Sequence, residues 1–126
     1  MTKSEILHFF FSSFGIPAYE EHSVPHWLDD AQTIETQPPY ITYEYAESWF
    51  FGESVPITAS IWDCSGSWTR LDSLTKAVAD SIGHFKKLTC DEGYILVTKG
   101  NPFATSLADG VYKRRYLNLN LTFVTN

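Results

Sequence analysis

The sequence predicts a single α+β domain over residues 1–126, built from a mostly antiparallel sheet with two helices packed on one face. Three observations support this prediction. Two segments repeat apolar residues at spacings of three or four, as amphipathic helices do, and several shorter segments alternate apolar and polar residues, as strands do. The third is size, because a chain of 126 residues buries roughly two thirds of its surface in one core and leaves no room for a second.

The first helix is predicted over residues 4–14. Thr2 and Glu5 have the spacing of a capping box, in which each side chain accepts a hydrogen bond from the other residue's backbone amide. Gly15 and Pro17 then supply a stop. The broad apolar face of this helix consists of Ile6, Leu7, Phe10, Phe11 and Phe14. We therefore expect the helix to be a core element.

The next segment, residues 17–39, is polar and rich in proline. This composition predicts a short edge strand near residues 16–19, followed mainly by loop. Two alternating strands come after it, over residues 40–46 and residues 57–62. The first of them places on one face Ile41, Tyr43 and Tyr45.

Between these two strands, residues 47–56 contain three adjacent aromatic residues, Trp49, Phe50 and Phe51. Neighbours in a strand or hairpin alternate sides, so the three rings cannot all point inward. At least one ring is expected to stand outward. It either folds back over the sheet edge as a small satellite cluster or anchors a neighbouring protein, because exposed aromatic clusters are typical of interface hot spots.

The second helix is predicted over residues 68–85 and is the clearest amphipathic segment of the chain. Its apolar stripe consists of Trp68, Leu71, Leu74, Val78, Ile82 and Phe85. Residues 65–67 are interpreted as the capping segment before the helix. Lys86 and Lys87 suit its C-terminus, where cations interact favourably with the helix dipole.

The last part of the chain predicts strands. Residues 88–90 and 94–99 are expected to form a hairpin, residues 100–110 a loop, and residues 111–124 a long final strand. The apolar residues that alternate along this strand are Leu117, Leu119, Leu121 and Phe123. Such alternation is typical of an antiparallel strand with one covered face, which we expect to receive the second helix.

The net charge of −6 and the pI near 5.0 argue against a nucleic-acid binder, which needs clustered Lys and Arg to contact phosphates. The one basic run, Lys113, Arg114 and Arg115, is expected to be solvated charge at the start of a strand. No segment has the apolar length of a membrane span, and residues 1–5 do not resemble a signal peptide. The two cysteines show no CxxC spacing and are expected to be reduced and buried or half-buried. They are Cys64 and Cys90.

The sequence holds no evident catalytic or cofactor-binding constellation, and it lacks the glycine-rich loops that cradle phosphates. His22 and His26, followed by Asp29 and Asp30, come nearest to a metal-ligand pattern, but Pro25 disfavours the helix that would bring the histidines together. We therefore predict no catalytic residues, no metal and no cofactor, and a protein that works by binding and assembly. Catalytic groups that meet only in space leave an enzyme open as an alternative.

Several segments, in order, carry a resemblance to a known family. They are an N-terminal helix, an early "IPAY", the strand "PPYITYEY", the strand-to-helix unit "ITASIWDCSGSWTRLDSLTKAVADSIG" and the closing strand "KRRYLNLNLTFV". This layout resembles the small tail terminator proteins of long-tailed bacteriophages, and the resemblance covers nearly the whole chain. In that family a strand ending near a Trp runs into a helix that lies across the sheet, and an amphipathic strand ends the protein. Trp62, residues 71–82 and residues 115–123 hold these places here.

The resemblance implies a hexameric ring, formed with other copies of the chain, that caps the finished tail tube and stops its polymerisation. The ring would offer a surface to the head completion or connector protein, although some such proteins stay monomeric until they meet the tube. It would be assembled in the host cytoplasm and lie at the head-proximal end of the virion tail, with no cofactor and no membrane contact. Genome DNA would only pass through its lumen, where negative charge repels phosphates. The candidate interface residues are Trp49, Phe50, Phe51, Pro102 and Phe103.

Three alternatives remain open. A head–tail connector completion protein would share the size and architecture. A small ligand-binding domain or enzyme would require a deep pocket with converging polar groups and perturbed pKa values. A monomeric adaptor or a host-directed inhibitor would keep the fold without forming a ring.

Overall fold

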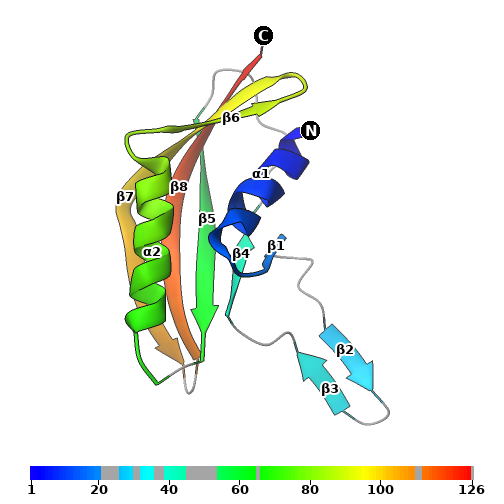
Figure 1. Ribbon diagram of the computed structural model, residues 1–126, viewed down its shortest axis with the longest axis vertical. Helices are drawn as coiled ribbons and strands as arrows, with labels where there is room; N and C mark the ends of the chain where they lie inside the picture. Colours follow the sequence, from blue (N-terminus) through cyan, green and yellow to red (C-terminus); the bar gives the residue numbers. More distant parts are fainter. Residues whose placement is uncertain are drawn as a thin grey trace.

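The computed structural model describes residues 1–20, 26–29, 32–35, 39–44, 54–64, 66–109 and 112–125, and for residues 26–29, 32–35 and 109 it describes the backbone alone. Along these residues the chain forms two α-helices, one 3₁₀ turn and eight strands (Figure 1). In chain order they are α1 (Lys3–Phe11), η1 (Ser12–Phe14), β1 (Ala18–Glu20), β2 (His26–Asp29), β3 (Gln32–Glu35), β4 (Tyr40–Tyr43), β5 (Ser54–Asp63), α2 (Thr69–Ile82), β6 (Lys86–Cys90), β7 (Gly93–Asp109) and β8 (Tyr112–Thr125).

Six of the strands form one curled sheet in the order β1-β4-β5-β8-β7-β6. Every neighbouring pair is antiparallel except β1 and β4, which are parallel. Strands β2 and β3 form a separate antiparallel pair. The predicted α+β fold with a mostly antiparallel sheet is therefore confirmed.

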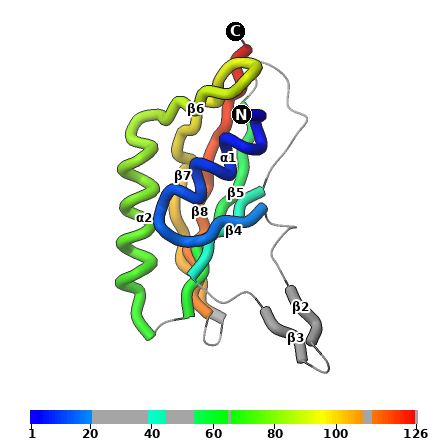
Figure 2. Tube along the Cα trace, turned by 45° about the vertical axis from the view of Figure 1, so that its right-hand side comes forward, coloured from blue at the N-terminus to red at the C-terminus, as the bar shows by residue number. Residues whose placement is uncertain are grey.

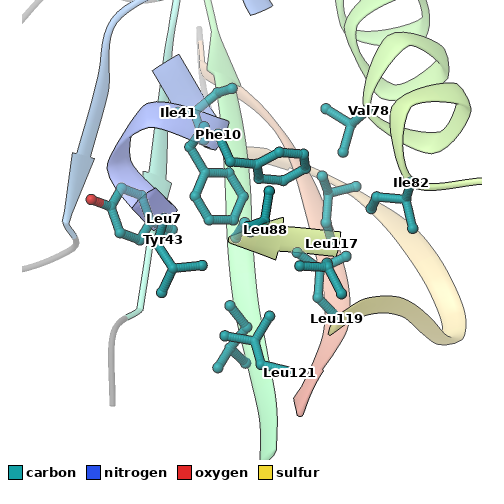
Figure 3. Packing of buried hydrophobic residues seen from close by; sticks show 14 of the residues in the cluster. Leu7, Phe10, Ile41, Tyr43, Val78, Ile82, Leu88, Leu117, Leu119 and Leu121 are labelled. Atoms are coloured by element: carbon teal, nitrogen blue, oxygen red, sulfur yellow. The ribbon is translucent and has the colours of Figure 1, made fainter. Parts of the chain in front are cut away.

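Both helices cover the same face of the sheet, α1 over β4 and β5 and α2 over β7 and β8 (Figures 1 and 2). Strand register brings Ile57 opposite Leu119 and Val97 opposite Leu121, so these side chains share the helix-covered face. The helices add to this core Leu7, Phe10, Phe11, Leu71, Val78 and Ile82. Figure 3 shows Leu7, Phe10, Val78 and Ile82 among them. All four apolar residues of the predicted dry face of β8 are buried, and each contributes roughly 1.5–3 kcal/mol relative to an exposed position.

The start of the chain folds as predicted. The Thr2 hydroxyl accepts a hydrogen bond from the Glu5 amide at 3.2 Å, and the Glu5 carboxylate accepts one from the Thr2 amide at 3.0 Å. Helix α1 passes into η1 and ends at Gly15, whose φ of 85° lies in the left-handed region that glycine adopts without a steric penalty. The buried face includes Phe11, whose ring stacks on the Tyr43 ring at a centroid distance of 4.6 Å.

Helix α2 begins after Trp68 and ends earlier than predicted. The Ser67 hydroxyl accepts a hydrogen bond from the Thr69 amide at 3.1 Å, but the N-cap residue is Trp68, which makes no side-chain capping hydrogen bond. Gly83, with a φ of 59°, ends the helix. Phe85 therefore lies beyond it and is 60% exposed, and Lys86 and Lys87 begin β6. The prediction that these two lysines close the helix is wrong.

Strand β7 is longer than predicted, because the chain expected to form a loop after residue 99 continues the strand as far as Asp109. Lys99 pairs with Leu119 and Ala104 pairs with Leu117, so the residues between Lys99 and Ala104 form a bulge. Glycine and proline are common in both loops and bulges, and here they mark a bulge. A Cβ on Gly100 would lie 2.9 Å from the Asn118 backbone oxygen, so glycine permits the close approach of the two strands.

Residues 17–39 also contain more strand than predicted. The short edge strand is confirmed as β1, but β2 and β3 replace part of the predicted loop with a hairpin in which Trp27 pairs with Ile34 and Leu28 with Thr33. Aromatic and β-branched residues favour strands, and this preference prevails over the surrounding prolines and acids. Strand β4 ends at Tyr43, and the predicted continuation over residues 45–46 lies outside the described residues.

The two thiols are free and differ in burial. Cys90 is 8% exposed at the end of β6, in agreement with the prediction. Cys64 is exposed, which corrects the expected burial, because it follows the last residue of β5 and lies outside the core.

Candidate functional site

The face of the sheet opposite the helices, called the outer face here, carries no helix among the described residues (Figures 1 and 2). Successive residues of a strand point to opposite faces, so the chain neighbours of the buried leucines in β8 point outward. These outward residues begin with Arg114 and Tyr116 and continue with Asn118, Asn120 and Thr122. One end of the outer face is therefore aromatic and cationic, and the middle is an amide-rich polar surface.

Four rings at the first end form what we call the aromatic row: Tyr19, Tyr40, Trp62 and Tyr116. The Tyr19 and Tyr40 rings meet edge to face at 5.9 Å, and the Tyr40 ring stacks on Trp62 at 6.2 Å. The Trp62 indole N–H donates to the Thr42 hydroxyl at 3.0 Å. The row thus connects strands β1, β4, β5 and β8 into one ordered surface.

Arg114 completes this surface. Its guanidinium carbon lies 4.5 Å from the centre of the Trp62 ring and 4.6 Å from the centre of the Tyr116 ring, and its Nε donates to the Ser60 hydroxyl at 2.8 Å. Ser60 is only 2% exposed beneath these groups. Cation–π contacts of this kind favour the position of the guanidinium against the two rings.

The basic run at the start of β8 is half-buried, which corrects its interpretation as solvated charge. Lys113 and Arg115 lie on the helix side, where the Lys113 ammonium and the Arg115 guanidinium approach the Trp68 ring. Arg114 lies on the outer face. Alternation along β8 separates the three cations, so they do not form a continuous basic patch.

The predicted interface residues fall in different places. Pro102 and Phe103 lie in the β7 bulge. Pro102 is exposed, and its carbonyl oxygen accepts a hydrogen bond from the side-chain amide nitrogen of Asn118 at 2.9 Å. Phe103 is half-buried and packs against the core cluster. The remaining three, Trp49, Phe50 and Phe51, lie outside the described residues.

Sequence reasoning missed the aromatic row, although the signal was present. The alternation that predicted the dry face of β8 also assigns Arg114 and Tyr116 to the opposite face, and the same rule assigns Tyr40 and Trp62 to the outer face of β4 and β5. Only the strand order brings these residues together.

A second feature is a groove of about 560 Å³ between α1 and β4, on the helix side of the sheet. The His8 ring bridges two hydroxyls in it, with Nδ1 3.2 Å from the Tyr43 oxygen and Nε2 3.3 Å from the Ser12 oxygen. Burial raises the pKa of the Tyr43 phenol, and the nearby Glu20 acts in the same direction. The groove also exposes an apolar ring, Phe9.

The metal-ligand pattern of the sequence is only partly described by the structure. His26 begins β2, and His22 lies outside the described residues. Within the described ranges, no three His, Cys, Asp or Glu side chains gather closely enough to hold a metal ion.

No protein-family model, curated protein or solved structure matches the chain. Among the described residues, neither α1 nor α2 has the length and apolar character that a membrane-crossing helix requires.

Proposed function

We propose that this chain is a structural assembly protein of the tail-terminator kind. Six copies form a ring that caps a phage tail tube, ends its polymerisation and presents a surface to the head completion protein. The ring lies at the head-proximal end of the virion tail, needs no cofactor and lets the genome pass through its lumen. The α+β fold with two helices on one face is consistent with the element order on which the resemblance rests.

The observation that carries the proposal is the aromatic row on a sheet face that carries no helix in the described part of the chain. Aromatic residues and arginine are enriched at protein interfaces, where they supply rigid contact area and act as hot spots. Tyr40, Trp62 and Arg114 form one interlocked set on this face. A surface organised in this way is suited to binding a protein more than to remaining in solvent.

A closed ring requires two different complementary surfaces on each subunit. We assign the first to the aromatic row. The second is the helix side, where α1 exposes the large ring of Phe9 at 58%. In this arrangement the outer face of one copy packs against the helix side of the next.

The test combines solution mass, negative-stain imaging and capping of purified tail tubes. Tyr40→Ala and Tyr116→Ala are expected to weaken subunit contacts by more than about 2 kcal/mol, roughly thirtyfold, while the protomer stays folded and its melting temperature falls only through the loss of the ring contacts within the row. Glu92→Ala, at an exposed position of the turn between β6 and β7, away from both assigned surfaces, is the control. Normal rings and normal capping in both tyrosine variants would contradict the assignment of the aromatic row.

The aromatic segment is tested in the same assays. Single changes of Trp49, Phe50 and Phe51 to Ala are expected to impair assembly if one of these rings anchors a neighbour. Unaltered assembly in all three variants would remove the segment from the contact surface. A large loss of thermal stability would instead place the rings in the core.

The groove beside α1 favours a second candidate, a small ligand-binding domain. It brings His8, Tyr43 and Ser12 together in a cavity of a size that small molecules occupy, and the pKa of one of these groups is raised. A thermal-shift screen of small molecules tests this candidate. A hit whose stabilising effect disappears in His8→Ala and persists in Tyr116→Ala would support it over the assembly role.

A further inference from the structure

The aromatic row ends in a small cavity that the assembly role does not by itself explain. Strand register places Trp62, Arg114 and Leu107 directly opposite one another on β5, β8 and β7. Together with Ala108 and Tyr112 they line a cavity of about 220 Å³ at the end of the sheet where β5 and β7 finish and β8 begins (Figure 1). Leu107 is 48% exposed and Tyr112 is 39% exposed, so the cavity opens to solvent.

Arg114 is the cation of this cavity, and its terminal nitrogens are available. The stacking on Trp62 and Tyr116 holds the guanidinium plane, and the hydrogen bond to Ser60 uses only Nε. Neither terminal nitrogen has a hydrogen-bond or carboxylate partner among the described residues. By contrast, Arg115 donates through both of its terminal nitrogens.

These terminal nitrogens present two parallel N–H donors in the geometry that a carboxylate accepts. The walls beside them are apolar, formed by the side chains of Leu107 and Trp62. A ligand that fits both features carries a carboxylate next to an apolar group. The volume lies below the roughly 300 Å³ at which small-molecule pockets begin, so it suits one or two amino-acid side chains.

We infer that Arg114 and this cavity form a subsite for an acidic side chain of a neighbouring protein, with an adjacent apolar side chain seated against Leu107. A nucleic acid is disfavoured, because phosphate binding requires several clustered cations and the protein carries a net charge of −6. The acidic segment of a partner, including another copy of this acidic chain, supplies the matching charge. The inference rests on the proposed assembly function and names the chemistry of one contact.

The experiment is an NMR titration of the full chain, following the Trp62 indole N–H and the Arg114 Nε–H signals. The probe is the capped dipeptide acetyl-Glu-Leu-amide, and its matched control is acetyl-Gln-Leu-amide, which has the same shape without the charge. Saturable shifts at both signals are expected with the acidic probe. Binding at least about tenfold weaker is expected with the neutral probe, because hydrogen bonds to charged groups are the stronger ones.

Variants then assign the contact. Arg114→Gln should weaken the acidic probe at least about tenfold, and Arg114→Lys, which keeps the charge but loses the planar fork, should weaken it by a smaller factor. Lys113→Gln removes the adjacent cation on the opposite face and should leave binding unchanged. Equal binding of both dipeptides, or binding that survives Arg114→Gln, would overturn the inference.

Two further titrations separate other ligands. Butyrate represents a free small acid and single-stranded oligothymidylate a nucleic acid, and either one binding more tightly than the acidic dipeptide would also overturn the inference. Because the titration needs no ring, its outcome is independent of assembly. Carboxylate binding without ring formation would support the subsite and contradict the proposed function. Normal capping of tail tubes without carboxylate binding would support the proposed function and contradict the subsite.

Discussion

Arg114 and Arg115 are consecutive in β8, and their guanidinium groups serve opposite faces of the sheet. Arg115 donates to the Thr75 hydroxyl at 3.2 Å and to the Asp72 carboxylate at 2.8 Å, both in α2. Arg114 stacks on Trp62 on the outer face. One arginine therefore fixes a helix to the sheet, and the other remains available to a partner.

The first prediction concerns this helix contact. Arg115→Ala should lower the free energy of unfolding by about 2 kcal/mol, because it removes two hydrogen bonds and the packing of the side chain near Trp68. Asp72→Asn should cost less than about 1 kcal/mol, since its carboxylate is 65% exposed and the pair is screened by solvent. Urea unfolding of both variants measures the difference, and equal losses would contradict this account of the contact.

The second prediction concerns Gly93, at the start of β7. A Cβ there would lie 2.0 Å from the Val124 carbonyl oxygen, and the φ of 157° is rare for other residues. Gly93→Ala should therefore destabilise the fold by about 2 kcal/mol or more, because β8 must shift. Gly66→Ala is the matched control, since the added Cβ would have no atom of the described residues within 4 Å apart from Gly66 itself and its chain neighbours. Equal melting temperatures for the two variants would contradict this prediction and would show that β8 shifts at Val124 without a large cost in stability.

The third prediction is a pH dependence. Burial raises the pKa of the Tyr43 phenol above its ordinary value of 10.0, with Glu20 acting in the same direction. The folded state therefore favours the neutral phenol. The corresponding stability is fully present below the pKa of the unfolded chain and is lost as the pH rises through the higher pKa of the folded state.

Tyr43→Phe removes this dependence while keeping the ring that stacks on Phe11. Free energies of unfolding measured between about pH 8 and about pH 11 should fall more steeply for the natural chain than for the variant. If the free energies of unfolding of the two proteins fall equally with pH, the pKa of Tyr43 is the same in the folded and unfolded states and the prediction is wrong. A constant offset between the two sets of free energies measures the lost hydrogen bond to His8.

The fourth prediction concerns the thiols. A thiol reagent should modify Cys64 rapidly and Cys90 only after unfolding, because the first is exposed and the second is buried. Cys64→Ser should abolish the rapid phase. Two rapid phases in the natural chain would indicate that the end of β6 opens in the folded protein.

The elements that sequence reasoning predicted well are those whose signals are local. The capping residues Thr2 and Glu5 and the helical repeat of Leu71, Val78 and Ile82 lie within a few turns of one another, and the structure has both helices where these signals place them. Alternation in β8 likewise predicted its buried face.

The signals that failed depend on distant partners. A run of turn residues at 100–102 is a bulge here because β8 supplies the pairing on both sides of it. Helix α2 ends at Gly83, and the last predicted turn, residues 83–85, instead leads into β6, where Lys86 pairs with Val97. The aromatic row depends on Tyr40, Trp62 and Arg114, which come from three strands, so no single segment reveals it.

The central position of β8 has a consequence for the order in which the chain folds. Strands β7 and β8 are joined by a short connection and can pair early, whereas β5 must close a loop of about sixty residues to reach Leu119 from Ile57. During synthesis β5 has no partner on that edge until residues 112–125 have left the ribosome. The N-terminal half, with β4 and β5, therefore waits with an unpaired and aggregation-prone edge, and a chain truncated before β8 should depend on chaperones to stay in solution.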